Sequence, residues 1–405
     1  MTSDQAAPPG AGLTSGSPAL RRLNLAMLCA ALAAFGLLYS TQALLPSLGA
    51  AFGVGPTAAS LTVSAATGAL ALAILPLSAV AESLGRVRVM RAGLLAACLC
   101  TFVVAAAPWF WLLVLARGLV GVALAAVVAV AVAHLGDEVH PAELGTAIGV
   151  YVAGNTLGGI SGRLIPGLVE ESLSWRFAVA LLAVVALAAA LAFTRMLPDA
   201  RTTSTSAPVS EHLAAVRSLL ADPGVVRLCL LAFLLMGGFV ACYNYLTFRL
   251  EAAPLGFSTT VTSLLFLAYL AGTVSSPLAG RLSDRFGRRR LALLGIAVSL
   301  AGLALTLPDS LACVTAGLLV FTAGFFAAHS VASSWVSQRA GRRRGQAAAM
   351  YLLAYYLGSS AFGALIGLAY QAAGWTAAAG AIAVLFALGA LSVAGVRPPA
   401  PRSRA

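Results

Sequence analysis

Apolar residues fill twelve long stretches of this chain, and short polar or glycine-rich segments separate them. A helix needs about 20 mainly apolar residues to cross the hydrocarbon core of a bilayer, and each stretch approaches or exceeds that length. The pattern therefore predicts an all-α membrane protein with twelve transmembrane helices. The predicted spans are residues 25–45, 58–81, 89–107, 110–135, 144–168, 177–196, 226–250, 259–282, 291–307, 311–337, 346–373 and 375–396.

The composition excludes an ordinary soluble domain. Charged residues make up 9% of the chain and hydrophobic residues 60%, whereas roughly a quarter of a typical soluble domain is charged. The six cysteines all lie inside apolar stretches, with neither a disulfide framework nor metal-ligand spacing, so we expect them to pack as small buried side chains.

The net charge of +12 depends on 25 basic residues, all of them arginine. If the N-terminus is cytoplasmic, 21 of these arginines fall in the cytoplasmic tails and loops or at the adjoining helix ends. Cytoplasmic segments of membrane proteins carry an excess of basic residues, so the pattern predicts that both termini are cytoplasmic. The charge thus indicates membrane topology and attraction to anionic lipid rather than nucleic acid binding.

The turn after the second span is repeated in the two halves of the chain. In the second half it runs from Gly280 to Arg290, and a modified copy in the first half runs from Ser78 to Arg88. A turn repeated roughly 200 residues apart indicates a duplicated six-helix unit, and duplicated helical units in a membrane usually move a solute across it.

The duplication predicts two pseudo-symmetric six-helix bundles that a polar segment joins. That segment begins with a Thr/Ser/Pro-rich run and ends with a short amphipathic piece over residues 211–220. Two bundles joined by one loop can rock against each other, as alternating access requires. The predicted division is a disordered cytoplasmic tail 1–22, an N-terminal bundle 23–197, a cytoplasmic linker 198–222, a C-terminal bundle 223–397 and a cytoplasmic tail 398–405.

On these residues the chain resembles the major facilitator superfamily, and within it the drug:proton antiporter branch that includes arabinose-efflux-like permeases. The resemblance covers residues 23–397, and the turn Gly280 to Arg290 is its most specific element. Arg117 with Gly121 resembles the fourth-helix motif of the family. The glycines of helix 5 resemble the antiporter motif of that helix, except that Asn155 stands where the motif has proline.

The resemblance implies that the repeated turn acts as a gate. Glu82 would cap helix 11 near Gly345, and Asp284 would cap helix 5 near Gly145, because a helix N-terminus favours negative charge. Both contacts would close the cytoplasmic side. A basic loop that only satisfies topology is the alternative, but it explains the arginines and not the glycine and acidic positions. The gating residues are Glu82, Gly85, Arg86, Arg88, Gly280, Asp284, Arg285, Gly287 and Arg288.

Proton coupling is the second role to assign. Members of the antiporter branch often carry the proton on a carboxylate of helix 1, and this chain has none there. His329 in helix 10 is the candidate, because imidazole titrates near physiological pH; a neutral packing histidine is the alternative. Arg117 lies deep in helix 4, where charge is costly. The resemblance implies that Arg117 supports coupling by contacting helix 1, and a structural bridge to backbone carbonyls is the alternative.

The substrate cavity is expected among the polar and aromatic side chains at mid to outer depth of the spans. Such groups suit a partly apolar substrate whose polar atoms need hydrogen bonds. Arg163 lies near the outer end of helix 5, where we expect its side chain to extend to the interface, although a cavity facing it would suit an anion. The candidate cavity residues are Tyr39, Gln42, Asn155, Tyr243, Asn244, Tyr355 and Arg163.

The sequence therefore predicts a secondary active transporter, with proton-linked export of small amphipathic or sugar-like molecules by alternating access. The alternative is a uniporter or importer of a small organic anion. No set of nucleophile, base or metal ligands indicates an enzyme, and a transport-dead membrane sensor is a remote alternative. The expected partners are a small-molecule substrate, protons and membrane lipid, with no cofactor. The chain is expected to be a monomer in the bacterial inner membrane.

Overall fold

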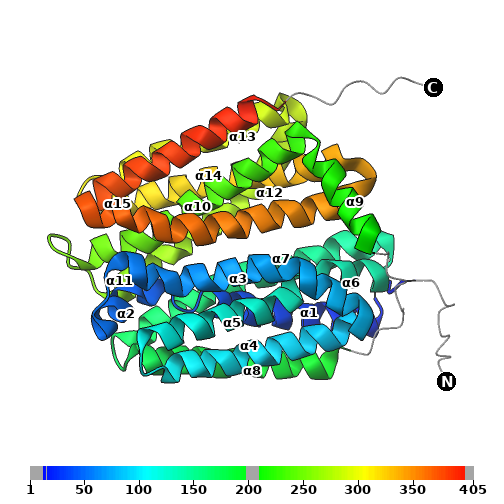
Figure 1. Ribbon diagram of the computed structural model, residues 1–405, viewed down its shortest axis with the longest axis horizontal. Helices are drawn as coiled ribbons and strands as arrows, with labels where there is room; N and C mark the ends of the chain where they lie inside the picture. The colour runs from blue at the N-terminus through cyan, green and yellow to red at the C-terminus, as the bar shows by residue number, and fades with distance from the viewer. Residues whose placement is uncertain (1–11, 15, 198–208, 397–405) are drawn as a thin grey trace.

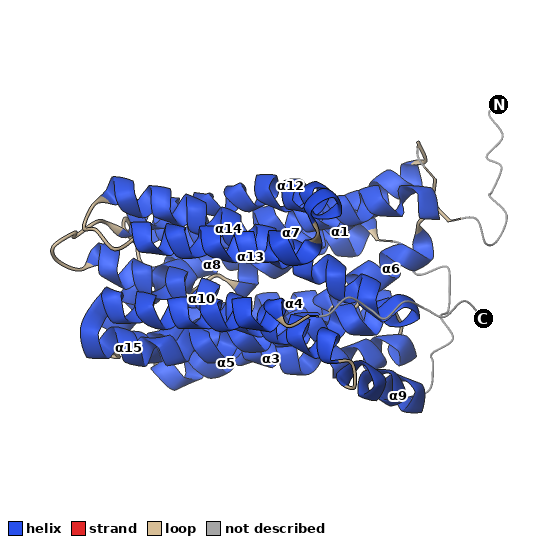
Figure 2. Cartoon of the chain, turned by 90° about the horizontal axis from the view of Figure 1, so that it is seen from above, coloured by secondary structure: helices blue, strands red, loops and turns tan. Residues whose placement is uncertain are grey.

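The computed structural model describes residues 12–14, 16–197 and 209–396. In this part of the chain, helices and short turns make up the molecule, together with one isolated bridge between Leu13 and Val139. The helices run along one long axis in two bundles, with the N-terminal half below and the C-terminal half above in Figure 1. Figure 2 shows the same elongated arrangement from above.

The first bundle contains the helices from Pro18 to Met196, and three of its predicted boundaries change. The first span is broken into α1, η1 and α2, and the fourth into α5 and α6. α1 begins at Pro18, within the segment predicted as a tail, because Ser17 caps it by accepting from the backbone N–H of Leu20 at 3.2 Å. The elements are α1 (Pro18–Leu38), η1 (Gln42–Leu44), α2 (Leu45–Phe52), α3 (Pro56–Leu84), α4 (Arg86–Ala106), α5 (Phe110–Val128), α6 (Ala131–Glu138), α7 (Pro141–Glu170) and α8 (Trp175–Met196).

The second bundle follows the linker helix α9, which covers nearly the same residues as the predicted amphipathic piece. Its second span, predicted as one helix, is broken into α11, η2 and α12. Its last two spans follow each other without a loop and carry the single label α15. Gly374 separates these two spans, because its φ of 68° lies in the left-handed region. The elements are α9 (Val209–Leu220), α10 (Pro223–Glu251), α11 (Thr259–Leu264), η2 (Leu265–Tyr269), α12 (Leu270–Phe286), α13 (Arg288–Leu305), α14 (Leu311–Ala340), η3 (Gly341–Arg343) and α15 (Arg344–Ala394).

Eight segments of the described residues are long and apolar enough to cross a membrane. One of them, Leu311–Ala394, contains three rods, since it holds α14 and both parts of α15. α7 and α13 complete a set of twelve rods. α13 begins with three consecutive arginines, and α7 carries a row of glycines and polar side chains, which lowers the hydropathy of each. The prediction of twelve helices in two bundles is confirmed.

The two bundles pack their helices in the same way. α7 packs on α1 in the first half, and the first part of α15 packs on α10 in the second. Glycine permits both approaches: a Cβ on Gly158 would come within 2.6 Å of the Leu32 carbonyl oxygen, and one on Gly358 would overlap the backbone of Phe233. Gly158 and Gly358 occupy corresponding positions of the repeat, so the duplication extends to the closest helix contacts.

The two ends of the molecule differ in how the halves meet. We call the end where α1 begins and α15 ends the terminal end, and the end that holds α2 and α11 the distal end (Figure 1). Between the halves, α3 packs extensively on α15, and near the distal end α7 packs on α11 and η2 while α10 packs on η1 and α2. α7 makes no comparable contact with α12, which continues toward the terminal end. The halves are thus joined distally and along α3 and α15, where Ser360 donates to the Ser64 carbonyl at 2.8 Å, whereas α7 and α12 separate toward the terminal end.

Candidate functional site

A break in the first span creates a set of free carbonyl groups at the centre of the N-terminal half. α1 ends at Leu38, and the last carbonyls of a helix have no partner within it. Arg117 of α5 is fully buried there. Its Nη1 donates to the Leu37 carbonyl at 2.7 Å and to Ser40 Oγ at 3.0 Å, and its Nη2 donates to the Leu38 carbonyl. The guanidinium therefore caps the broken helix, where the helix dipole favours positive charge.

Arg117 also reaches a third helix. Its Nε donates to the carbonyl of Thr62 on α3 at 2.8 Å. The contact with helix 1 that the family resemblance implies is therefore present, and it is made to backbone carbonyls. This geometry gives Arg117 a clear structural role, while its role in proton coupling stays a prediction.

A second buried arginine lies between the two halves. Arg163 of α7 has 1% of its surface exposed. It does not extend to the membrane interface as its position near the helix end predicts, because its partners lie in the core. Its Nε donates to Gln42 Oε1 at 2.7 Å, its Nη1 donates to the Gly159 carbonyl, and its Nη2 lies 3.2 Å from the hydroxyl of Tyr269. The guanidinium also lies 3.9 Å from the ring centre of Tyr39, a cation–π distance.

Gln42 extends this arrangement across the interface. Its Nε2 donates to Asn244 Oδ1 on α10 at 2.8 Å, and Asn244 Nδ2 lies 3.4 Å from the Gly363 carbonyl on α15. Gln42 and Asn244 are both fully buried. One chain of hydrogen bonds, which we call the interface network, thus joins helices of both halves. It contains Gly159, Arg163, Gln42, Asn244, Gly363 and Tyr269.

Further hydrogen bonds hold the halves together toward the distal end. Tyr245 donates its hydroxyl to Ser60 Oγ at 3.0 Å, and Thr57 donates to Gln371 Oε1 at 2.7 Å. Glu171 accepts from the backbone N–H of Thr260 at 3.2 Å. Hydrogen bonds from Thr260 and Ser258 hold the pKa of Glu171 below its ordinary value. The distal end is therefore closed by several polar contacts that cross from one half to the other.

The candidate proton carrier lies in an aromatic group of the C-terminal half. His329 Nδ1 lies 3.0 Å from the Tyr351 hydroxyl. Its ring is parallel to that of Phe325 at a centroid distance of 5.8 Å and lies 4.8 Å from the ring centre of Tyr355. Tyr355 is half-buried, and its hydroxyl makes no hydrogen bond with the described residues. The structure thus brings two of the predicted site residues, His329 and Tyr355, into contact.

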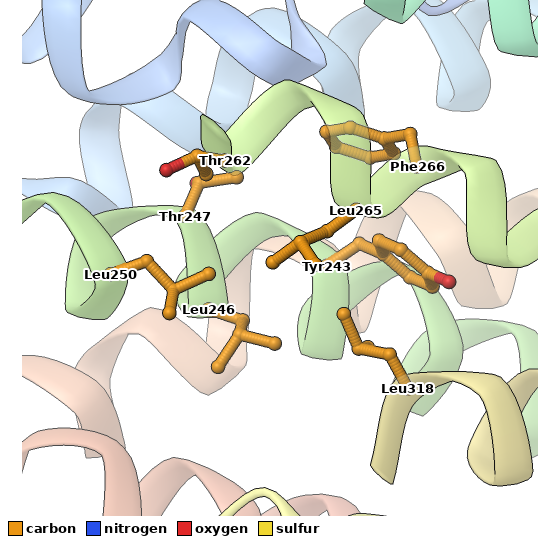
Figure 3. A pocket seen from close by; sticks show the side chains of 8 residues that line it. All are labelled: Tyr243, Leu246, Thr247, Leu250, Thr262, Leu265, Phe266 and Leu318. Atoms are coloured by element: carbon orange, nitrogen blue, oxygen red, sulfur yellow. The ribbon is translucent and has the colours of Figure 1, made fainter. Parts of the chain in front are cut away.

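Two other predicted cavity residues occupy different environments. Tyr243 is buried inside the C-terminal half, where its hydroxyl is bonded to Thr322 Oγ1 at 2.7 Å, so it offers no free hydroxyl at the interface. Asn155 is half-buried on α7, and its Oδ1 has no hydrogen-bond partner among the described residues. Tyr243 lines a small pocket of mainly apolar character (Figure 3). The pocket residues are Tyr243, Leu246, Thr247, Leu250, Thr262, Leu265, Phe266 and Leu318.

The two gating contacts that the resemblance implies are not formed in this structure. Asp284 is exposed and Glu82 is half-buried. Neither side chain makes a hydrogen bond or an ion pair with the described residues. Gly145 and Gly345, near which they would cap, are exposed as well. For Asp284 the reason is that α12, which carries it, makes no comparable contact with α7, which carries Gly145. The gating role of the turn stays a prediction for a state with this end closed.

Ion pairs within each half hold the terminal end. Arg86 of the first gating turn pairs with Asp137 of α6. Asp222 caps α10 by accepting from the Gly224 N–H at 2.8 Å and pairs with Arg339 of α14 at 2.8 Å. Burial acts to raise the pKa of Asp222, but the hydrogen bonds from Arg339 and Gly224 outweigh it, and the pKa lies below its ordinary value.

Sequence reasoning missed Tyr269, Tyr245 and Gln371. Tyr269 contacts Arg163, while Tyr245 and Gln371 cross between the halves. Each is a polar side chain inside or at the end of an apolar span, so the same criterion that selected Tyr39 could have included them. Their partners could not be inferred, because these depend on how each helix is rotated about its axis.

Two pseudo-symmetric six-helix bundles that meet through a buried polar network at one end define a membrane transporter. The sequence model of the Major Facilitator Superfamily matches residues 23–274 and 251–405. The chain belongs to this superfamily, and it is a transporter and not an enzyme.

Known proteins agree with this assignment. The chain is 41% identical over 385 residues to the Inner membrane transport protein YnfM of Escherichia coli (strain K12), covering 95% of this chain and 92% of that protein. It is 36% identical over 371 residues to the Uncharacterized MFS-type transporter YybF of Bacillus subtilis (strain 168), covering 91% and 92%. The solved structure of a bacterial homolog of the human lysosomal transporter Spinster, inward-facing and unoccupied, superposes with a TM-score of 0.75 at 16% identity, covering 94% and 95%.

Proposed function

We propose that this protein is a proton-linked exporter of small amphipathic or sugar-like molecules that works by alternating access. The observation that carries the proposal is the asymmetry between the two ends of the molecule. The interface network and its distal neighbours join the halves at one end, while α7 and α12 separate toward the other. An alternating-access carrier in one of its two end states has this arrangement.

The proposal assigns the terminal end to the cytoplasm. This end carries both gating turns and most of the arginines, as the cytoplasmic side of a bacterial inner membrane protein does. Both termini are then cytoplasmic, and the separated end faces the cytoplasm. An exporter loads its cargo in this state, so the structure corresponds to the loading step, with the protein acting as a monomer.

The proposed cargo follows from the side chains near the interface. The ring centres of Tyr39 and Tyr269 lie 3.9 and 4.5 Å from the guanidinium carbon of Arg163. Tyr355 lies against His329 in the C-terminal half. Aromatic rings accept apolar molecules and the flat faces of sugars, while hydroxyl and amide groups fix orientation. A small amphipathic or sugar-like molecule suits this combination.

The proposed coupling uses His329. Its ring is half-buried, and its Nδ1 is bonded to Tyr351, so it can gain a proton in one state and lose it in the other. A carboxylate is absent from helix 1, and this leaves His329 as the titratable group at mid-depth. Arg117, which fixes the break in helix 1, would transmit the change of helix position to the N-terminal half.

Reconstitution of the purified protein tests the proposal. A screen of fluorescent or radiolabelled compounds in an efflux-deficient bacterial host first supplies a transported compound. Proteoliposomes with an imposed pH gradient should then move this compound against the proton flux, and an ionophore that collapses the gradient should stop accumulation. Flux that is unchanged by the ionophore would refute proton coupling and favour a uniporter or importer of an organic anion.

A further inference from the structure

Arg163 is a buried positive charge whose partners are all neutral. It contacts the side-chain oxygen of Gln42, the backbone carbonyl of Gly159 and the hydroxyl of Tyr269. Among the described residues no carboxylate pairs with it. Removal of a charge from water is costly unless the charge is paired, and the rings of Tyr39 and Tyr269 compensate only in part. The charge therefore has no counter-ion among the described residues.

The guanidinium also has unused hydrogen-bond donors. Arginine carries five N–H groups, of which the Nε group binds Gln42, one Nη1 group binds Gly159 and one Nη2 group faces Tyr269. One N–H on each terminal nitrogen has no acceptor among the described residues. Two donors on neighbouring nitrogens suit a carboxylate or a similar oxyanion, which arginine binds in a fork.

The surface of α7 beside these donors, toward the terminal end, carries no bulky side chain at Gly159. Gly159 lies one helical turn before Arg163, and a Cβ there would meet Nη1 of Arg163 at 3.2 Å and no other described side chain or neighbouring helix within 4 Å. Asn155 lies one further turn along the same face of α7, and its buried Oδ1 has no partner. A free acceptor oxygen and two free N–H groups thus lie along one stripe of α7.

We propose that Arg163 binds the anionic group of the transported molecule, which is an organic acid of the carboxylate class with an apolar or aromatic body, and that Asn155 lines the path to this site. The acid enters from the terminal end, its oxygens accept from the two free N–H groups of Arg163, and its body lies against Tyr39 and Tyr269. The inference rests on the proposed transport function, because it names the cargo of the same central site. It is independent of the direction of transport and of proton coupling.

The position of Arg163 links the bound acid to the gate. The same guanidinium that would bind the acid donates to Gln42, and Gln42 donates to Asn244 in the other half. An acid that draws the guanidinium toward Gly159 therefore weakens the contact that closes the distal end. Cargo binding and opening of that end become coupled through one side chain.

Thiol labelling next to Arg163 tests this inference without any transport assay. The Asn155→Cys variant is placed in phosphatidylcholine nanodiscs, which hold no anionic lipid. Residue 155 is then modified with the anionic reagent methanethiosulfonate ethylsulfonate or with neutral methyl methanethiosulfonate, and mass spectrometry of the peptide measures each rate. We expect the ratio of anionic to neutral rates to fall about fivefold when Arg163→Gln is added, since a charge about 12 Å along the helix attracts the reagent.

Control variants separate charge from structure. Arg163→Lys should keep most of the preference for the anionic reagent, and Arg176→Gln on α8 should leave it unchanged. Gly159→Cys repeats the test one turn closer to Arg163 if Asn155→Cys folds poorly. An unchanged ratio in Arg163→Gln at both cysteine positions overturns the inference.

Protection experiments identify the source of the anion. Benzoate should slow neutral labelling of Asn155→Cys more than benzamide does, and this difference should disappear in Arg163→Gln. Protection by phosphatidylglycerol in the nanodiscs but not by benzoate would assign the site to a lipid headgroup and overturn the cargo assignment. If charge-selective labelling is present but flux ignores the pH gradient, the proton-linked export fails and the acid site stands.

Discussion

Gln42 of the first half donates a hydrogen bond of 2.8 Å to Asn244 of the second half, and both side chains are fully buried. A buried amide without a partner costs free energy, so each residue needs the other as long as the halves are closed. The two residues lie at corresponding helices of the repeat, α10 and the continuation of α1. The pair therefore belongs to one state of the transporter and should separate in the other.

Arg117 should be essential for the stability of the N-terminal half. Arg117→Met removes every hydrogen bond that Arg117 donates to Leu37, Leu38, Ser40 and Thr62, and we expect a loss of about 3 kcal/mol in the free energy of unfolding. Arg117→Lys should recover part of it, because one ammonium cannot reach every acceptor. Thermal unfolding of the purified variants measures this. The control Arg176→Met, near the distal end of α8, should lose much less, and equal losses would contradict the capping role.

Asp284 should matter for cycling and not for folding. It makes no bond with the described residues in this state, so the free energy of unfolding of Asp284→Asn should lie within about 0.5 kcal/mol of the parental value. When the terminal end closes, Asp284 would cap α7 near Gly145. Asparagine should form a weaker cap there, and exchange of a transported compound should slow severalfold. Asp309→Asn, at the distal end, serves as the control. Normal exchange by Asp284→Asn would remove the gating role of the turn.

His329→Gln should flatten the pH dependence of transport, because glutamine does not titrate. Initial rates of transport across a pH series measure the effect. Tyr351→Phe removes the hydroxyl at 3.0 Å but keeps the imidazole, so it should shift the midpoint and retain the slope. His140→Gln, in the loop before α7, should behave as the parent. If His329→Gln retains the parental profile, the histidine is a packing residue.

Asp222 gives a pH dependence of stability outside the membrane. Its pKa is lowered by Arg339 and Gly224, so the ion pair stabilises the protein above the ordinary carboxyl pKa, and the effect is lost as pH falls through the lowered pKa. At neutral pH, the free energy of unfolding of Asp222→Asn should be about 1 kcal/mol lower than that of the parent, since asparagine keeps the cap but not the charge. The two proteins should converge in acid. A constant difference across the pH range would show that the charge is not responsible.

The sequence was sufficient for the fold and insufficient for the site. Apolar length and the repeated turn predict twelve helices in two bundles, because a bilayer permits few alternatives. The break after Leu38 was not predicted, since apolar residues continue on both sides of it and only Arg117 marks the free carbonyls. The sequence indicates Arg163 as a cavity residue, but its burial depends on the rotation of α7 and on Gln42 from another helix.

The gating residues show a different limit. The turn around Glu82 and Asp284 is visible in the sequence, but a single chain conformation realises only one of the states that the turn serves. A sequence motif reflects the contacts of every state of the transport cycle, without showing which contacts belong to which state. The contacts near Gly145 and Gly345 therefore cannot be expected in a structure whose terminal end is separated.

Reciprocal motion of the two ends is the central claim, and paired distance measurements by electron spin resonance test it most directly. Spin labels are placed at Leu173→Cys and Ala253→Cys for the distal end, and at Ser83→Cys and Arg342→Cys for the terminal end. Gln42→Leu removes the bond to Asn244 and should shift the population by about two- to tenfold, the worth of one hydrogen bond. Thr67→Val is the control, because Thr67 bonds only within its own helix.

In Gln42→Leu, the account predicts that the long distal distance gains population while the short terminal distance gains population to the same extent. Thr67→Val should match the parent at both ends. Distal lengthening with an unchanged terminal distance, or lengthening at both ends together, would contradict alternating access in this protein.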